Sequence, residues 1–159
     1  SELVDIALSG AGRMLPIALI LLLAIALGDV SRALGTGPWL AQIVGTQVSP
    51  EWLPLLVFLS AAATAFAIGS SWGTFAIMIP IAMPLALALS LPAPLLLGAV
   101  LSGAVFGDHA SPVSDTTVVA SMAAATDHIE HVRTQLPYAL LAAAMSALLY
   151  LGAGLIAAP

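Results

Sequence analysis

Long apolar runs divide the chain, and the stretches between them hold most of its polar residues. A helix needs about 20 apolar residues to cross the hydrocarbon core of a bilayer. Runs of that kind predict spans near 14–34, 53–68, 73–91, 95–125 and 136–158. They do not alternate between apolar and polar positions as the strands of a transmembrane barrel do. The pattern therefore predicts an all-α integral membrane protein with about five transmembrane segments, some of them broken or re-entrant.

The first interruption of the apolar sequence is Gly69–Thr74. Gly69 and Gly73 weaken a helix here, and the hydroxyls between them supply oxygen atoms. This predicts either two spans joined by a surface turn or one helix that is broken inside the protein. Beyond it, Pro80 and Pro84 each remove a backbone donor, so we expect a kinked helix.

The second interruption, 107–117, divides the span predicted over 95–125. The apolar run before it, Leu95–Phe106, is too short to cross the membrane alone. Gly107 and Pro112 disfavour a regular helix, because the proline ring clashes with the carbonyl of Asp108. We expect one crossing with an unwound centre, or two half-helices that meet inside the membrane. Backbone freed at that depth must be buried in protein or line a water-filled cavity.

The composition excludes a water-soluble domain. The 159 residues are 61% hydrophobic and 7% charged, whereas soluble domains are about 25% charged. This apolar composition makes the lipid bilayer the expected surroundings. Only three residues are basic, which argues against nucleic acid as a partner. Cysteine is absent, so disulfides and thiolate metal sites are excluded.

The second interruption carries most of the candidate chemistry. Asp108, Ser111 and Asp115 follow the spacing i, i+3, i+7, which gathers their oxygen atoms on one helix face. Small hard cations prefer oxygen ligands, and a carboxylate removed from water also binds a proton more readily. A carboxylate that binds either Na⁺ or H⁺, but not both, is the minimal device for exchanging them. The alternative is that Asp108 and Asp115 cap the starts of half-helices.

Further hydroxyls complete the predicted ion site. They come from both interruptions and are Ser114, Thr116, Thr117, Ser70, Ser71 and Thr74. Those of the first interruption are either ligands or only helix-breaking residues.

Other polar residues are candidates for a proton path or for the membrane surface. His109 either joins a proton path or faces solvent. Asp29 either joins that path or pairs with Arg32, three residues on, at the interface. His128 and His131 have the spacing of a metal site, but we expect a solvated turn, because the sequence offers no buried third ligand. We expect no cofactor and no metal beyond the transported Na⁺.

Three sequence motifs resemble those of NhaC-type sodium/proton antiporters. The stretch 107–117, GDHASPVSDTT, resembles the signature G-D-x-x-S-P-[IL]-S-D-T-T. Upstream, 69–75 is similar to G-T-S-W-G-T, and 127–138 is similar to D-H-I-x-H-[VA]-x-T-Q-[LM]-P-Y. Ser70 replaces the usual Thr and Val113 replaces Ile or Leu, and neither change removes an oxygen ligand.

This resemblance implies a secondary antiporter, not an enzyme, built from inverted repeats with broken helices. Members of the family are much longer, so the chain looks like most of the C-terminal half. The implied partner is the N-terminal half or a second copy of the chain, and the implied location is a prokaryotic inner membrane. Some members exchange organic anions or amino acids with Na⁺, which leaves the substrate open. The start at Ser1, without Met or a basic leader, also favours a fragment.

Two other functional classes fit the sequence less well. An intramembrane aspartyl protease needs two aspartates that share a proton. The presenilin-like pattern G-x-G-D is not met, because Val105 stands two positions before Gly107, and no Tyr-Asp pair occurs. The remaining alternative is a membrane subunit that does not itself transport.

Overall fold

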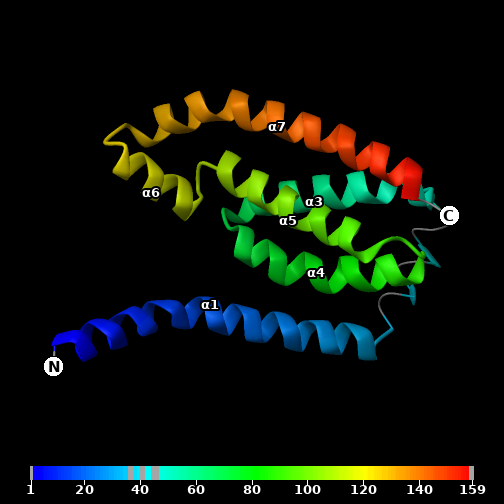
Figure 1. The fold of residues 1–159 in the computed structure, drawn as a ribbon, viewed down its shortest axis with the longest axis horizontal. Coiled ribbons are helices and arrows are strands. Elements are labelled where there is room, and N and C mark those ends of the chain that lie inside the picture. The colour runs from blue at the N-terminus through cyan, green and yellow to red at the C-terminus, as the bar shows by residue number, and fades with distance from the viewer. Residues whose placement is uncertain (1, 36–37, 40–41, 44–46, 158–159) are drawn as a thin grey trace.

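The protein is a bundle of helices in the computed structural model, which describes residues 2–35, 38–39, 42–43 and 47–157 (Figure 1). Every regular element in these ranges is helical: α1 (Glu2–Ala33), the 3₁₀ turn η1 (Pro50–Trp52), α3 (Leu53–Ile68), α4 (Ser71–Ala88), α5 (Ala93–Ala110), α6 (Asp115–Ala123) and α7 (His128–Ala157). Four helical stretches in this part of the chain are long and apolar enough to cross a membrane: 50–68, 71–88, 93–110 and 128–157. The predicted class, an all-α integral membrane protein, is confirmed.

The helices run side by side, with α3 and α5 antiparallel to α4 (Figure 1). Helix α7 lies against α3 and α5, and α1 lies against α4. The short helix α6 stands at one end of the bundle, between the end of α5 and the start of α7. This arrangement brings the start of α4, the end of α5 and the start of α6 to the same end of the protein.

The contact between α3 and α5 is close because α5 has glycine where it meets the α3 backbone. A Cβ added to Gly103 would lie 2.3 Å from the Phe58 carbonyl oxygen, and one added to Gly107 would lie 2.2 Å from that of Ala62. Small residues spaced four apart permit such packing between membrane helices. The sequence had suggested that Gly107 breaks the helix. This prediction is wrong, because α5 continues through Gly107, which instead permits close packing against α3.

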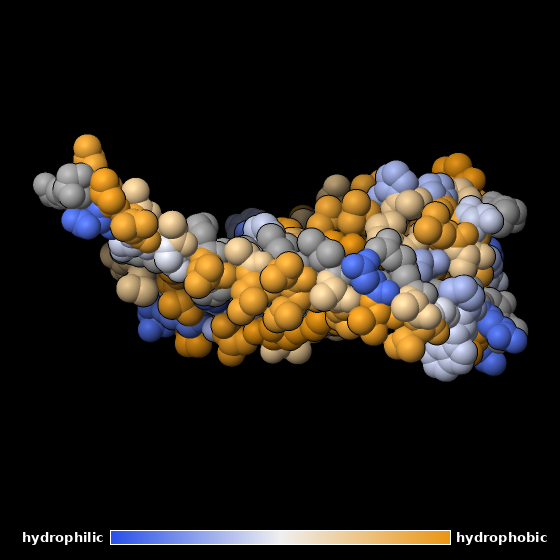
Figure 2. All heavy atoms as spheres, turned by 90° about the horizontal axis from the view of Figure 1, so that it is seen from below, coloured by the Kyte–Doolittle hydropathy of each residue, from blue (hydrophilic) through white to orange (hydrophobic). Residues whose placement is uncertain are grey.

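The apolar core fills the space between α3, α4 and α5. Phe58, Leu96 and Val100 are its largest fully buried apolar side chains, and Leu85 and Ala86 of α4 pack against them. The outer surface is also largely hydrophobic, as the lower face shows (Figure 2). A bundle that is apolar on both its inside and its outside is suited to lipid.

The interruptions are shorter than the sequence indicated. Helix α5 continues to Ala110 and alone reaches membrane length, so the second interruption narrows to Ser111–Ser114. Helix α5 ends at Ala110 because a proline disfavours the helical conformation of the residue before it. Ser111, which precedes Pro112, is extended, with ψ 127°. Likewise, Gly73 lies in the first turn of α4 and does not break it. Gly69 does end a helix, because it caps α3 with a φ of 73°.

Candidate functional site

Asp108 is the centre of the polar cluster. It lies near the end of α5, and only 4% of its surface is exposed. The Ser71 hydroxyl donates a hydrogen bond to its Oδ2 over 3.0 Å, and the Ser114 hydroxyl donates one to its Oδ1 over 2.5 Å. Three separate segments of the chain thus meet at one buried carboxylate.

The segment after α5 is held in place by Ser111. Its hydroxyl donates to the Phe66 carbonyl on α3 over 2.8 Å and accepts from the Val113 backbone N–H over 3.3 Å. Its own N–H donates to the Asp108 carbonyl. Ser111 is fully buried. These bonds satisfy backbone groups that the interruption frees, as burial in a membrane requires.

The start of α4 is fixed by Ser70. It caps the helix, and its hydroxyl accepts a hydrogen bond from the Gly73 N–H over 3.3 Å. The buried Thr74 donates its hydroxyl to the Ser70 carbonyl over 3.0 Å. Ser70 and Thr74 therefore shape the first turn, and this turn directs Ser71 toward Asp108.

The start of α6 is fixed by Ser114 in the same manner. Its hydroxyl accepts from the Thr117 N–H over 3.3 Å and lies 2.8 Å from the Thr116 hydroxyl. Thr117 also donates its hydroxyl to the Asp108 carbonyl over 3.4 Å. One serine thus caps a helix and binds the buried carboxylate at the same time.

Two helix starts, those of α4 and α6, present their positive dipole ends to Asp108. Each helix N-terminus acts as roughly half a positive charge, which favours a carboxylate. Within the described residues, no basic side chain pairs with Asp108, and the salt bridge found there joins Arg133 to Glu130 on the surface. Among the described residues, the Asp108 carboxylate is therefore held by hydroxyls and helix starts and not by a basic side chain.

Asp115 occupies a different environment from that of Asp108. It is the first residue of α6, is exposed, and accepts a hydrogen bond from the Thr116 N–H through its own carboxylate over 2.8 Å. The two aspartates predicted as a pair do not share a hydrogen-bond partner among the side chains described. In this segment Asp115 behaves as an acidic residue in the first turn of a helix.

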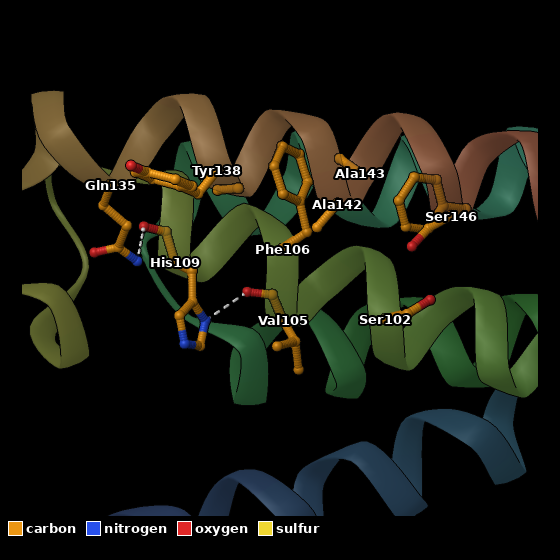
Figure 3. Close-up of a pocket in the computed structure, with 11 residues that line it drawn as sticks. Ser102, Val105, Phe106, His109, Gln135, Tyr138, Ala142, Ala143 and Ser146 are labelled. Carbon is orange, nitrogen blue, oxygen red and sulfur yellow. Dashed lines mark hydrogen bonds between the residues drawn. The ribbon is translucent and has the colours of Figure 1, made fainter.

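The two proton-path candidates do not reach the Asp108 carboxylate. His109 is exposed, contacts the Val105 carbonyl through Nδ1 over 2.9 Å, and lines a pocket of about 430 Å³ between α5 and α7 (Figure 3). Asp29 is near the far end of α1, at the opposite end of the bundle from α6 (Figure 1). The Arg32 side chain, its predicted partner, lies outside the described residues.

The contact between His128 and the Pro112 carbonyl was not predicted from the sequence. We expected His128 in a solvated turn, but it is half-buried and bonds to the chain between α5 and α6. Nothing in its spacing signalled this, because the contact joins residues sixteen positions apart. The histidines and carboxylates described in the structure form no cluster of three or more suited to a metal ion.

The fold and site define a helical membrane protein with a buried carboxylate where broken helices meet. The profile of the Na⁺/H⁺ antiporter family matches residues 1–155. The chain belongs to this family. Its similar proteins of stated function are antiporters.

Several relatives are similar over most of the chain. An uncharacterized protein of Haemophilus influenzae is 44% identical over 137 residues, which cover 85% of this chain and 26% of the relative. The arginine/ornithine antiporter ArcD of Halobacterium salinarum is 41% identical over 67% of this chain and 22% of its own length. The Na⁺/H⁺ antiporter NhaC of Alkalihalophilus pseudofirmus is 34% identical over 62% of this chain and 21% of its own length. The chain thus spans about a quarter of the relatives it matches. No solved structure matches it.

Proposed function

We propose that this chain carries the ion-binding part of a secondary antiporter that exchanges Na⁺ for H⁺. The observation that supports this most is the environment of Asp108: a buried carboxylate that receives two serine hydroxyls and has no basic partner among the described side chains. A buried carboxylate without a counter-charge is costly in a membrane and is generally functional.

The exchange follows from a single negative charge. Na⁺ and H⁺ would each neutralise Asp108, so binding of one excludes the other. The Ser71 hydroxyl makes no further hydrogen bond to the described residues, and its lone pairs are therefore open to a cation. The Ser114 oxygen is more occupied, because it also accepts from the Thr117 N–H. Ser71 is therefore the better candidate for a direct ligand, and Ser114 both orients Asp108 and caps α6.

The remaining predicted ligands have graded roles in this proposal. Ser70, Thr74, Ser111 and Thr117 hold the helix ends, since their hydroxyls bond to the backbone or cap it. Asp115 and Thr116 lie on the exposed side of α6, where another part of a longer transporter would complete the site. That part is the N-terminal half of the protein or a second copy, in a prokaryotic inner membrane.

A second candidate is exchange of a small organic solute coupled to Na⁺ or H⁺. It is favoured by the names of two relatives, the ArcD arginine/ornithine antiporter and the malate-2H⁺/Na⁺-lactate antiporter of Bacillus subtilis, which is 36% identical over 65% of this chain. Peptide hydrolysis is not favoured, because the partners of Asp108 are hydroxyls, whereas that chemistry needs a second aspartate at hydrogen-bonding distance.

The test is Na⁺-driven proton flux in proteoliposomes that hold the full-length protein and no organic solute, followed with a pH-sensitive dye inside the vesicles. We expect the wild type to acidify or alkalinise the lumen according to the Na⁺ gradient, and Asp108→Asn to abolish the flux. Flux that appears only after an amino acid or a carboxylate is added would support the second candidate. Undiminished flux in Asp108→Asn would overturn the assignment of Asp108.

Asp127→Asn is the matched control for the loss of a carboxylate. Asp127 is exposed and caps α7, accepting from the backbone N–H groups of Ile129 and Glu130. Asparagine also caps helices well, so we expect this variant to retain the wild-type flux.

A further inference from the structure

The interruption between α5 and α6 leaves the Pro112 carbonyl without a partner in either helix. His128, the first residue of α7, reaches it from across the bundle end: its Nε2 lies 2.7 Å from the Pro112 oxygen. A carbonyl can only accept, so Nε2 carries the proton in this contact. This bond therefore ties the chain between α5 and α6 to the start of α7.

The second ring nitrogen of His128 contacts α6. Its Nδ1 lies 3.2 Å from the hydroxyl of Ser121, which is 2% exposed and also 2.8 Å from the Val118 carbonyl. In neutral imidazole with the proton on Nε2, Nδ1 accepts. The Ser121 hydroxyl has one proton, which it donates to the Val118 carbonyl or turns toward Nδ1. One side chain thus bridges the interruption, α6 and α7.

Pro112, whose carbonyl His128 binds, lies two residues before Ser114. Ser114 donates a hydrogen bond to Oδ1 of Asp108. Ser111 anchors one end of this short segment to α3 through the Phe66 carbonyl. His128 anchors its middle. The remaining freedom of Ser114 is small when both anchors are present and larger when one is removed.

We propose that His128 is a positioning residue, which holds the Pro112 carbonyl and thereby keeps Ser114 against Asp108. The inference rests on the proposed exchange of Na⁺ and H⁺ at Asp108. His128 touches neither the ion nor the carboxylate, so its loss changes the affinity of the site more than the maximal rate of exchange.

Two near-isosteric variants separate its two bonds. In glutamine the amide nitrogen takes the place of Nε2, so His128→Gln keeps a donor for Pro112. In asparagine the amide reaches only the place of Nδ1, so His128→Asn loses that donor. His131→Ala is the matched control, because the half-buried His131 side chain makes no hydrogen bond among the described residues.

The measurement is the KM for Na⁺ and the maximal proton flux of the full-length protein in proteoliposomes. We expect His128→Asn and His128→Ala to raise the KM about tenfold, while His128→Gln and His131→Ala stay within about twofold. Maximal flux should change little in all four. A wild-type KM in His128→Asn, or a KM in His128→Gln as high as in His128→Ala, would overturn the proposal.

A second readout does not depend on transport. Val113, which is 65% exposed, follows Pro112 in the interruption. In a background with Val113→Cys as the sole cysteine, we expect a water-soluble maleimide to label the His128→Asn protein faster than the His128→Gln protein. Equal labelling would contradict the proposed bridge. Absence of Na⁺-driven flux in the wild type would instead refute the exchange function and leave the labelling result standing.

Discussion

Ser114 donates a hydrogen bond of 2.5 Å to Oδ1 of Asp108, although the helix that carries Asp108 ends between the two residues. The same hydroxyl accepts the Thr117 N–H and so begins helix α6. The start of one helix and the buried charge at the end of another are therefore joined through one oxygen atom. Changes at this oxygen affect both the fold and the candidate ion site.

Removing the two hydroxyls that bind Asp108 should weaken Na⁺ binding unequally. A hydrogen bond to a charged group contributes about 1.5–3 kcal/mol. We expect Ser71→Ala to raise the KM for Na⁺ roughly tenfold or more, and Ser114→Ala to raise it further, because α6 also loses its cap. Both are measured as Na⁺-driven proton flux. Ser102→Ala, which removes a hydroxyl that bonds to Tyr150 instead, is the control, and an equal effect there would contradict the prediction.

The two aspartates of the second interruption should differ in their importance. Asp108 is buried and held by two serines, whereas Asp115 is exposed and bonds to a backbone N–H of its own helix. An acidic residue in the first turn of a helix contributes about 0.3–1 kcal/mol. We therefore expect Asp115→Asn to retain proton flux at a reduced level and Asp108→Asn to lose it. Complete loss in Asp115→Asn would show that it is a second essential ligand.

Na⁺ and H⁺ should compete for the transporter. In the proposed exchange one carboxylate binds both ions. The KM for Na⁺ should therefore rise as the pH falls, by at most about tenfold for each pH unit, while the maximal flux at saturating Na⁺ stays unchanged. The measurement is flux against Na⁺ concentration at several pH values. A KM that does not change with pH would indicate separate sites for the two ions.

Adding a methyl group to Gly107 should destabilise the protein. The new Cβ would lie 2.2 Å from the Ala62 carbonyl oxygen, so α5 would have to move away from α3. Overpacking of this kind typically costs about 1–3 kcal/mol. We expect a lower unfolding temperature of the detergent-solubilised protein. Gly152→Ala is the control, since no atom outside its own helix lies within 4 Å of its Cβ position, and the same decrease there would contradict the packing argument.

The class of the protein and the location of its polar cluster could be predicted from the sequence. A chain with 7% charged residues and long apolar runs has too few polar residues to cover its surface in water. Composition alone therefore predicts a membrane protein. The order Asp108, Ser111, Pro112, Ser114 also marks where a helix must end, because proline restricts its neighbours locally. Such features depend on residues close together in the chain.

Only the tertiary structure decided which of these residues meet. Asp108 and Ser71 are 37 positions apart, and they come together because α3, α4 and α5 pack with their ends aligned. The same packing buries Asp108 while Asp115 stays exposed, brings His128 to Pro112, and keeps Gly107 within a helix. A local pattern can supply donors and acceptors, but their pairing depends on helix contacts between distant parts of the chain.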